Sequence, residues 1–176
     1  EDQIKNNAKE LINWLQSKEF KIILLSGDNN KKCKSIADKF GITEFHGEKM
    51  PDQKLKIINE LIQNEQIIMV GDGINDAPSL TIANVGISFG KAADIAQNAA
   101  DVIILENDDL LKVKKLIITS QKTLSTIKQN LFWALFYNVV AIPIAAFGFL
   151  SPIIAAGSMA FSDLIVIGNS IRLKYK

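Results

Sequence analysis

The strongest constraint on the fold is the segment Gly71–Leu80, G-D-G-I-N-D-A-P-S-L, which directly follows the apolar run Gln66–Val70. An apolar run that ends at turn-forming residues predicts a buried strand of a parallel sheet. The carboxylates of Asp72 and Asp76 therefore come at, and just beyond, the carboxyl end of a strand. That end is where ligands bind in an open α/β sheet.

Paired carboxylates are hard oxygen ligands, which suit Mg²⁺, and Mg²⁺ in turn holds phosphate oxygens. Small or turn-forming residues lie between and beside the carboxylates and let the backbone approach a bound anion: Gly71, Gly73 and Asn75. The segment therefore predicts a magnesium and phosphate site.

The first two thirds of the chain alternate between apolar strand patterns and amphipathic helix patterns. This alternation predicts a doubly wound parallel sheet, an α/β fold. The expected strands are 20–25, 42–46 (a short edge segment), 67–70, 85–88 and 101–105, and a helix is expected over 92–99.

Two further polar elements occur upstream, each close to a predicted strand end. Ser26-Gly27-Asp28-Asn29 follows the strand at 20–25, and Lys49-Met-Pro-Asp-Gln-Lys54 opens a helix.

Together the three elements resemble the P-type ATPases, ion pumps whose phosphorylation domain is haloacid-dehalogenase-like. G-D-G-I-N-D-A-P is similar to their hinge motif, S-G-D-N to their T-G-D-N element, and P-D-Q-K to their P-x-x-K element. The resemblance implies that residues 1–110 are the carboxyl-terminal part of a phosphorylation domain. It also implies ATP and Mg²⁺ as cofactors.

The same resemblance implies a role for each matching residue. Ser26, with Gly27 and Asp28, would bind phosphoryl oxygens through a hydroxyl and backbone N–H groups. Lys54 would neutralise an aspartyl phosphate. Asp72 would hold Mg²⁺ directly, and Asp76 would support it.

Charged side chains are nearly absent from residues 130–171. No charged side chain lies in 130–149, and Asp163 is the only one in 150–171. Each stretch is about twenty residues, enough to cross a hydrocarbon core of roughly 30 Å. We therefore expect a linking helix at 111–129 and transmembrane helices at 130–149 and 150–173, joined by a tight turn.

Lysine and arginine flank this pair of segments and are missing from the turn between them. Five lysines lie in 112–128, and Arg172, Lys174 and Lys176 follow the second segment. The positive-inside rule then places both chain ends in the cytoplasm of a multi-pass membrane protein, which we expect in a bacterial plasma membrane. The expected partner is the lipid bilayer, and the net charge of +1 suggests no nucleic-acid partner.

Polar side chains at membrane depth are costly and mark transport paths. The candidates are Tyr137 and Asn138, then Met159, Ser162, Asp163 and Asn169. The stretch 129–143, with its Tyr-Asn pair, resembles the penultimate span of copper-transporting P-type ATPases. The stretch 159–173 resembles their last span, M-A-x-S-S followed by N-A-x-R-L. The resemblance implies Cu(I) as the transported ion, and the soft thioether of Met159 suits it.

Asp163 departs from the copper pattern, which has a second serine there. Three interpretations stay open: a shift toward a divalent ion, as in zinc- and cadmium-exporting relatives; a protonated Asp163 hydrogen-bonded to Asn138; or a gene no longer under selection.

The 176 residues contain no D-K-T-G-T sequence, which in P-type ATPases carries the phosphorylated aspartate, and no T-G-E or Cys-Pro-Cys sequence. We therefore expect this chain to be inactive alone and to depend on the remaining pump domains or on an upstream-encoded half. The alternatives are a membrane-anchored phosphatase-like hydrolase, a non-enzymatic remnant and one half of a split pump.

Overall fold

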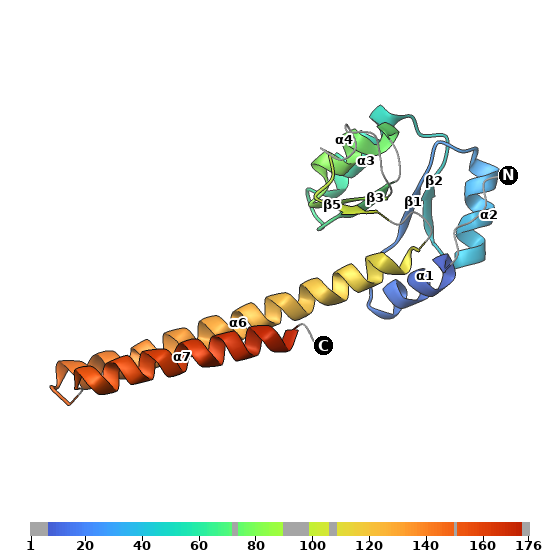
Figure 1. Ribbon diagram of the computed structural model, residues 1–176. Coiled ribbons are helices and arrows are strands. Elements are labelled where there is room, and N and C mark those ends of the chain that lie inside the picture. Colours follow the sequence, from blue (N-terminus) through green and yellow to red (C-terminus); the bar gives the residue numbers. More distant parts are fainter. Residues whose placement is uncertain (1–6, 72–73, 90–98, 106–108, 150, 174–176) are drawn as a thin grey trace. The chain divides into compact units, whose positions relative to one another are not determined.

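The computed structural model describes residues 7–71, 74–89, 99–105, 109–149 and 151–173 (Figure 1). Its contacts divide the chain into two compact units, Glu1–Lys114 and Lys115–Lys176. The elements follow one another in the order α1 (Ala8–Ser17), β1 (Ile23–Leu25), α2 (Asn30–Phe40), β2 (Glu44–His46), α3 (Pro51–Leu61), β3 (Ile68–Gly71), the 3₁₀ turn η1 (Ile74–Asp76), α4 (Ala77–Ile82), β4 (Val85–Phe89), β5 (Val102–Ile104), α6 (Leu111–Ala146) and α7 (Pro152–Arg172).

All strand pairs in the first unit are parallel, as the alternating pattern predicts. β1 pairs with β2, with Leu24 opposite Phe45. β3 pairs with β4, and β4 pairs with β5. The described strands form two parallel sheets, β1–β2 and β3–β4–β5. Within the described part of the chain, β1 pairs with β2 alone and β3 pairs with β4 alone.

Local sequence sets where the helices near the site begin and end. The side chain of Asn29 accepts a hydrogen bond of 2.8 Å from Lys32 N, which caps the first turn of α2. Gly41 ends that helix at φ +67°, a left-handed conformation that glycine adopts without strain. Pro51 stands in the first turn of α3, where the missing N–H costs nothing.

Among the described residues of the first unit, apolar side chains pack into clusters that include the following two. The first joins α1 to α2 and contains Ala8, Ala37, Phe40 and Ile42. The second lies between α3, α4 and β3 and contains Ile58, Met69, Leu80 and Ala83. Figure 1 shows α3 and α4 over the β3–β4–β5 sheet, so this second cluster supports the strand ends that carry the polar residues.

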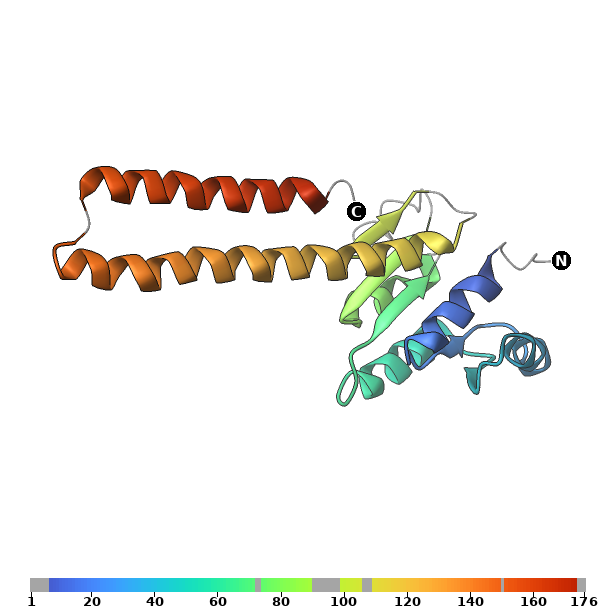
Figure 2. The ribbon, with the colours of Figure 1, turned by 90° about the horizontal axis from the view of Figure 1, so that it is seen from below.

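The second unit consists of α7 and the part of α6 that follows Lys114. The two helices run side by side in opposite directions in both views (Figures 1 and 2). Their connection, 147–151, contains Gly148 at φ +79°. The first helix ends at Ala146, three residues before the expected end of the first span.

Among the described helices, α6 is the one that is long and apolar enough to cross a membrane by length and composition. Membrane-spanning character is thus supported for one helix, and the second span stays a prediction. The helix expected over 92–99 lies outside the described residues.

Candidate functional site

The loop after β1 brings Ser26, Gly27 and Asp28 to the carboxyl end of a strand. The backbone N–H of Asp28 donates to Ser26 Oγ over 3.1 Å, so the hydroxyl fixes the turn. Asp28 Oδ2 lies 3.1 Å from Lys32 Nζ, one helical turn further on, and both side chains are exposed to solvent. The carboxylate of Asp28 is therefore partly neutralised by Lys32.

Two backbone hydrogen bonds tie this loop to the segment that leads into α3. Lys49 N donates to Ser26 O over 3.0 Å, and Glu48 N donates to Asp28 O over 2.7 Å. These bonds hold the S-G-D-N element beside the start of the helix that carries Lys54.

Lys54, in the second turn of α3, forms an ion pair with Asp76 at the end of η1. Lys54 Nζ lies 2.8 Å from Asp76 Oδ1, and the side chains are only 12% and 15% exposed. A pair shielded to this degree is much less screened by salt than a surface pair. It joins two sequence elements that are 22 residues apart.

Gly71 gives Asp76 the room it needs at the end of β3. A Cβ atom at position 71 would lie 2.9 Å from Asp76 Cβ and 3.0 Å from its Oδ2. No real side chain fits at that distance, so the glycine allows the carboxylate to fold back over the strand end. Asn75 is exposed beside it, and Asp72 and Gly73 lie outside the described residues.

The chemistry of this site suits Mg²⁺ and phosphate. Asp76 supplies a hard carboxylate next to a fixed ammonium group. An ammonium group has three donors, of which Asp76 takes one, so Lys54 can also bind an anion. Within the described ranges no group of three or more His, Cys, Asp or Glu side chains could hold a metal ion. The expected principal ligand, Asp72, falls outside those ranges.

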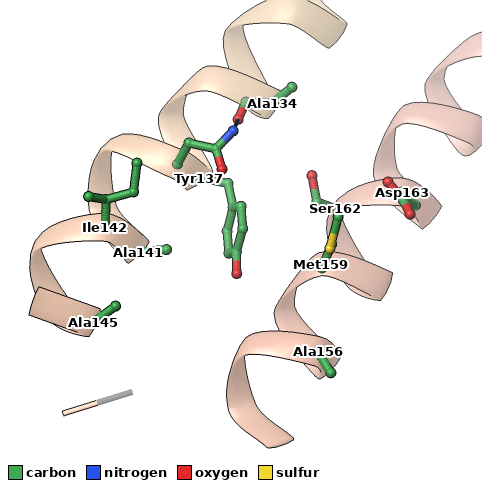
Figure 3. Close-up of a pocket in the computed structure, with 10 residues that line it drawn as sticks. Ala134, Tyr137, Ala141, Ile142, Ala145, Ala156, Met159, Ser162 and Asp163 are labelled. Carbon is green, nitrogen blue, oxygen red and sulfur yellow. Dashed lines mark hydrogen bonds between the residues drawn. The ribbon is translucent and has the colours of Figure 1, made fainter. Parts of the chain in front are cut away.

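The candidate residues of the second unit line a pocket of about 470 Å³ between α6 and α7 (Figure 3). Tyr137 extends from α6 toward α7, and Met159 and Ser162 lie on the side of α7 that faces it. The lining residues are Ala134, Tyr137, Asn138, Ala141, Ile142, Ala145, Ala156, Met159, Ser162 and Asp163. The structure thus gathers in one pocket five of the six side chains expected along a transport path; the sixth, Asn169, is not among the lining residues.

The pairing of Asp163 with Asn138, one of the three interpretations of Asp163, is not found. Asn138 Nδ2 instead donates to Ala134 O in its own helix, over 2.9 Å. The carbonyl one turn back is always within reach of an asparagine side chain in a helix, which explains the preference.

Known proteins resemble the chain over nearly its whole length. A protein of Enterococcus hirae named as a probable copper-importing P-type ATPase A is 46% identical over 99% of the chain. A copper-exporting P-type ATPase of Staphylococcus epidermidis is 46% identical over 98% of the chain. A crystal structure of a zinc-transporting PIB-type ATPase in the E2.Pi state superposes on 98% of the chain with a TM-score of 0.89 and 30% identity.

Family models agree with these relatives. A model described as haloacid dehalogenase-like hydrolase matches residues 1–84, and a second with the same description matches residues 53–117. The chain belongs to the P-type ATPases. It spans only 24% and 22% of the two named relatives and 28% of the solved structure.

Membership confirms the predicted family and the haloacid-dehalogenase-like α/β fold. Two features of this P-type ATPase chain escaped prediction. The Lys54–Asp76 ion pair carries no local signal, because its partners are 22 residues apart. The Asp28–Lys32 pair did have a signal, since an acidic and a basic residue only four positions apart flank the start of α2.

Proposed function

We propose that this chain is part of an ATP-driven pump that exports a heavy-metal ion, Cu(I) in the first instance. The observation that carries the proposal is the shielded Lys54–Asp76 pair, which joins the P-x-x-K element to the G-D-G-I-N-D element at a strand end. In this proposal residues 1–110 belong to the phosphorylation domain, 111–129 link it to the membrane, and 130–149 and 150–173 span the bilayer.

The first unit would bind a phosphoryl group by charge and position, which is how phosphoryl transfer is generally catalysed. Ser26 Oγ and the backbone after β1 would bind its oxygens together with Lys54 Nζ. Asp72 and Asp76 would hold Mg²⁺, and the ion would neutralise part of the negative charge of the phosphoryl group. Gly71, Gly73 and Asn75 would keep the strand end open for close approach.

The phosphorylated aspartate would come from the part of the pump that the relatives have beyond these 176 residues. Two observations support a strand arriving there. β1 and β3 each have an edge without a partner among the described strands. Ile68 and Val70 of β3 are 40% exposed, although an inner parallel strand normally buries such side chains.

Copper fits the pocket between α6 and α7. Met159 provides a thioether, a soft ligand for Cu(I), and Tyr137 and Ser162 face the same space. The names of the two relatives, which specify copper, support this choice. A zinc-type pump is the second candidate, because Asp163 adds a harder carboxylate to the lining and the solved structure is of a zinc-transporting ATPase.

The lipid bilayer and the remaining pump domains are the proposed partners. The apolar composition of α6 supports membrane insertion. We place the protein in a bacterial plasma membrane with residues 112–128 and 172–176 on the cytoplasmic side, following the distribution of lysine and arginine.

A chimera tests the proposal. The aligned segment of the Enterococcus hirae relative is replaced by this chain, and transfer of labelled phosphate from ATP is measured in membrane vesicles. We expect an acid-stable phosphoenzyme that requires Mg²⁺ and disappears when the acceptor aspartate is changed to asparagine. A chimera that inserts into the membrane but takes up no label, while the intact relative does, would show a non-enzymatic remnant.

A further inference from the structure

Four polar side chains connect α6 to α7 at one end of the pocket. They are Gln129 and Asn130 on α6 and Asn169 and Ser170 on α7, here called the amide clasp. Nothing in the phosphoryl site or in the pocket lining uses them.

Hydrogen bonds in the amide clasp are shared among all four side chains. Asn169 Nδ2 donates to Asn130 Oδ1 over 2.8 Å and to Gln129 Oε1 over 3.2 Å. Asn130 Nδ2 donates to Ser170 Oγ over 3.0 Å. The Ser170 hydroxyl donates a hydrogen bond to Val166 O over 2.8 Å. Asn130 thus both accepts from α7 and donates to it, which fixes the two helices in rotation as well as in distance.

The clasp lies on the same helical stripes as the pocket. On α6, the lining residue Ala134 comes one turn after Asn130, and Tyr137 comes two turns after it. On α7, Asp163 comes two turns before Ser170, and Met159 comes one turn earlier still. The faces of α6 and α7 that the clasp joins are therefore the faces that line the pocket.

At the other end of the pocket the short connection 147–151 ties the helices covalently. The pocket is thus held between a covalent tie and a hydrogen-bonded one. A change at the clasp would let α7 turn or slide against α6, and Met159 and Ser162 would lose their positions opposite Tyr137.

We infer that the amide clasp is a positioning device that sets the register of α7 against α6 and thereby the geometry of the metal pocket. Asn169 is its central residue, because it donates to both partners on α6. The metal part of this inference rests on the proposed function. The register part does not.

The register is tested on the full 176-residue chain in lipid nanodiscs. Spin labels are attached at Lys128→Cys and Arg172→Cys, in a Cys33→Ser background, and their distance distribution is measured. With Asn169 in place, we expect a narrow distribution of label distances. Asn169→Leu should broaden this distribution, and Asn169→Gln, which keeps an amide, should leave it closer to that of the unmodified chain. Thr126→Val is the matched control, since the Thr126 hydroxyl bonds only to Lys122 O in its own helix. An unchanged distribution in Asn169→Leu would overturn the inference.

The metal part is tested in the chimera. Asn169→Leu should raise the KM for the stimulating metal ion roughly 3- to 20-fold, as expected for one or two lost interhelical hydrogen bonds in a membrane, with little change in kcat. A broadened distance distribution with an unchanged KM would contradict the positioning role. If the unmodified chimera shows no metal-dependent activity, the proposed function fails, whereas the label distances still decide whether the clasp sets the register.

Discussion

Lys54 Nζ and Asp76 Oδ1 lie 2.8 Å apart in a position where both side chains are largely shielded from water. Their contact draws the start of α3 onto the turn that follows β3. It therefore brings the two charges that the proposed reaction needs to the same strand end. Removal of either partner leaves the other shielded and without its counter-charge, which is costly.

This contact leads to the first prediction. In the chimera, Lys54→Met should lower the phosphoenzyme level by about 10²- to 10³-fold, the usual cost of removing one preorganised group that stabilises developing charge. Lys56→Met is the matched control, because Lys56 is exposed on the same helix. Quantitative labelling with ATP at saturating Mg²⁺ measures both. Equal losses in the two variants would point to a general effect on α3 and not to a role for Lys54.

A second prediction concerns magnesium. Asp72→Asn in the chimera should abolish Mg²⁺-dependent labelling, because a neutral amide is a much poorer Mg²⁺ ligand than a carboxylate. Asp76→Asn should act in the same direction but less completely, and Asp52→Asn, an exposed carboxylate on α3, should have no effect. The measurement is a Mg²⁺ titration of phosphoenzyme formation. A wild-type titration curve for Asp72→Asn would remove Asp72 from the metal site.

The third prediction addresses packing under the site. A Cβ at Gly86 would lie 2.5 Å from the backbone oxygen of Leu80, so Gly86→Ala must push α4 away from β4. We expect a destabilisation of about 1–3 kcal/mol, typical of overpacking. Gly27→Ala is the control, since its Cβ would meet Lys49 O at an ordinary 3.6 Å. Thermal unfolding of the full chain in detergent compares the two, and similar midpoints would contradict the close α4–β4 contact.

Much of this architecture follows from local sequence. The positions of β3, α3 and the turn after β1 could be predicted because apolar runs end there at Gly, Pro, Asp or Asn, whose turn and capping preferences are local. The long apolar stretch of α6 could be predicted from the absence of charge alone.

Long-range features could not be predicted in this way. The division of the described strands into two sheets depends on which strands pair over long sequence distances, and local sequence patterns do not determine that. The Asn169–Asn130 bond joins residues 39 positions apart and requires the two helices to be placed first. The hydrogen bond from Asn138 to Ala134 O could not be predicted either, because the polar pattern does not show whether a helical asparagine bonds to its own helix or to a neighbouring one.

A fourth prediction concerns pH. The hydrogen bond from Lys21 lowers the pKa of Glu44, against a smaller opposing effect of burial, and Glu44 in turn raises the pKa of Lys21. A lowered carboxyl pKa adds stability above the unfolded-state value, and that stability is lost as pH falls through the folded-state value.

Glu44→Gln should therefore lower the unfolding midpoint slightly at pH 7, and this difference should shrink at pH 3, because acid protonates the carboxylate of Glu44 and removes its advantage. The effect is small because both side chains are partly exposed. Thermal unfolding at the two pH values measures it. A larger difference at pH 3 than at pH 7 would reverse the sign and contradict the prediction.

The fifth prediction concerns the transported ion. Met159→Ala in the chimera should reduce Cu(I)-stimulated activity because a soft ligand is removed from the pocket. Asp163→Ser, which restores the copper-family pattern, should keep or improve Cu(I) stimulation and weaken any response to Zn²⁺.

The most direct test is the metal dependence of phosphoenzyme formation in the chimera with this chain unmodified, Cu(I) and Zn²⁺ being titrated separately at constant Mg²⁺ and ATP. The proposed role in a copper-exporting pump predicts labelling that rises with Cu(I) and responds weakly or not at all to Zn²⁺. Labelling that requires Zn²⁺ and ignores Cu(I) would contradict it and make Asp163 the deciding ligand of a zinc-type pump.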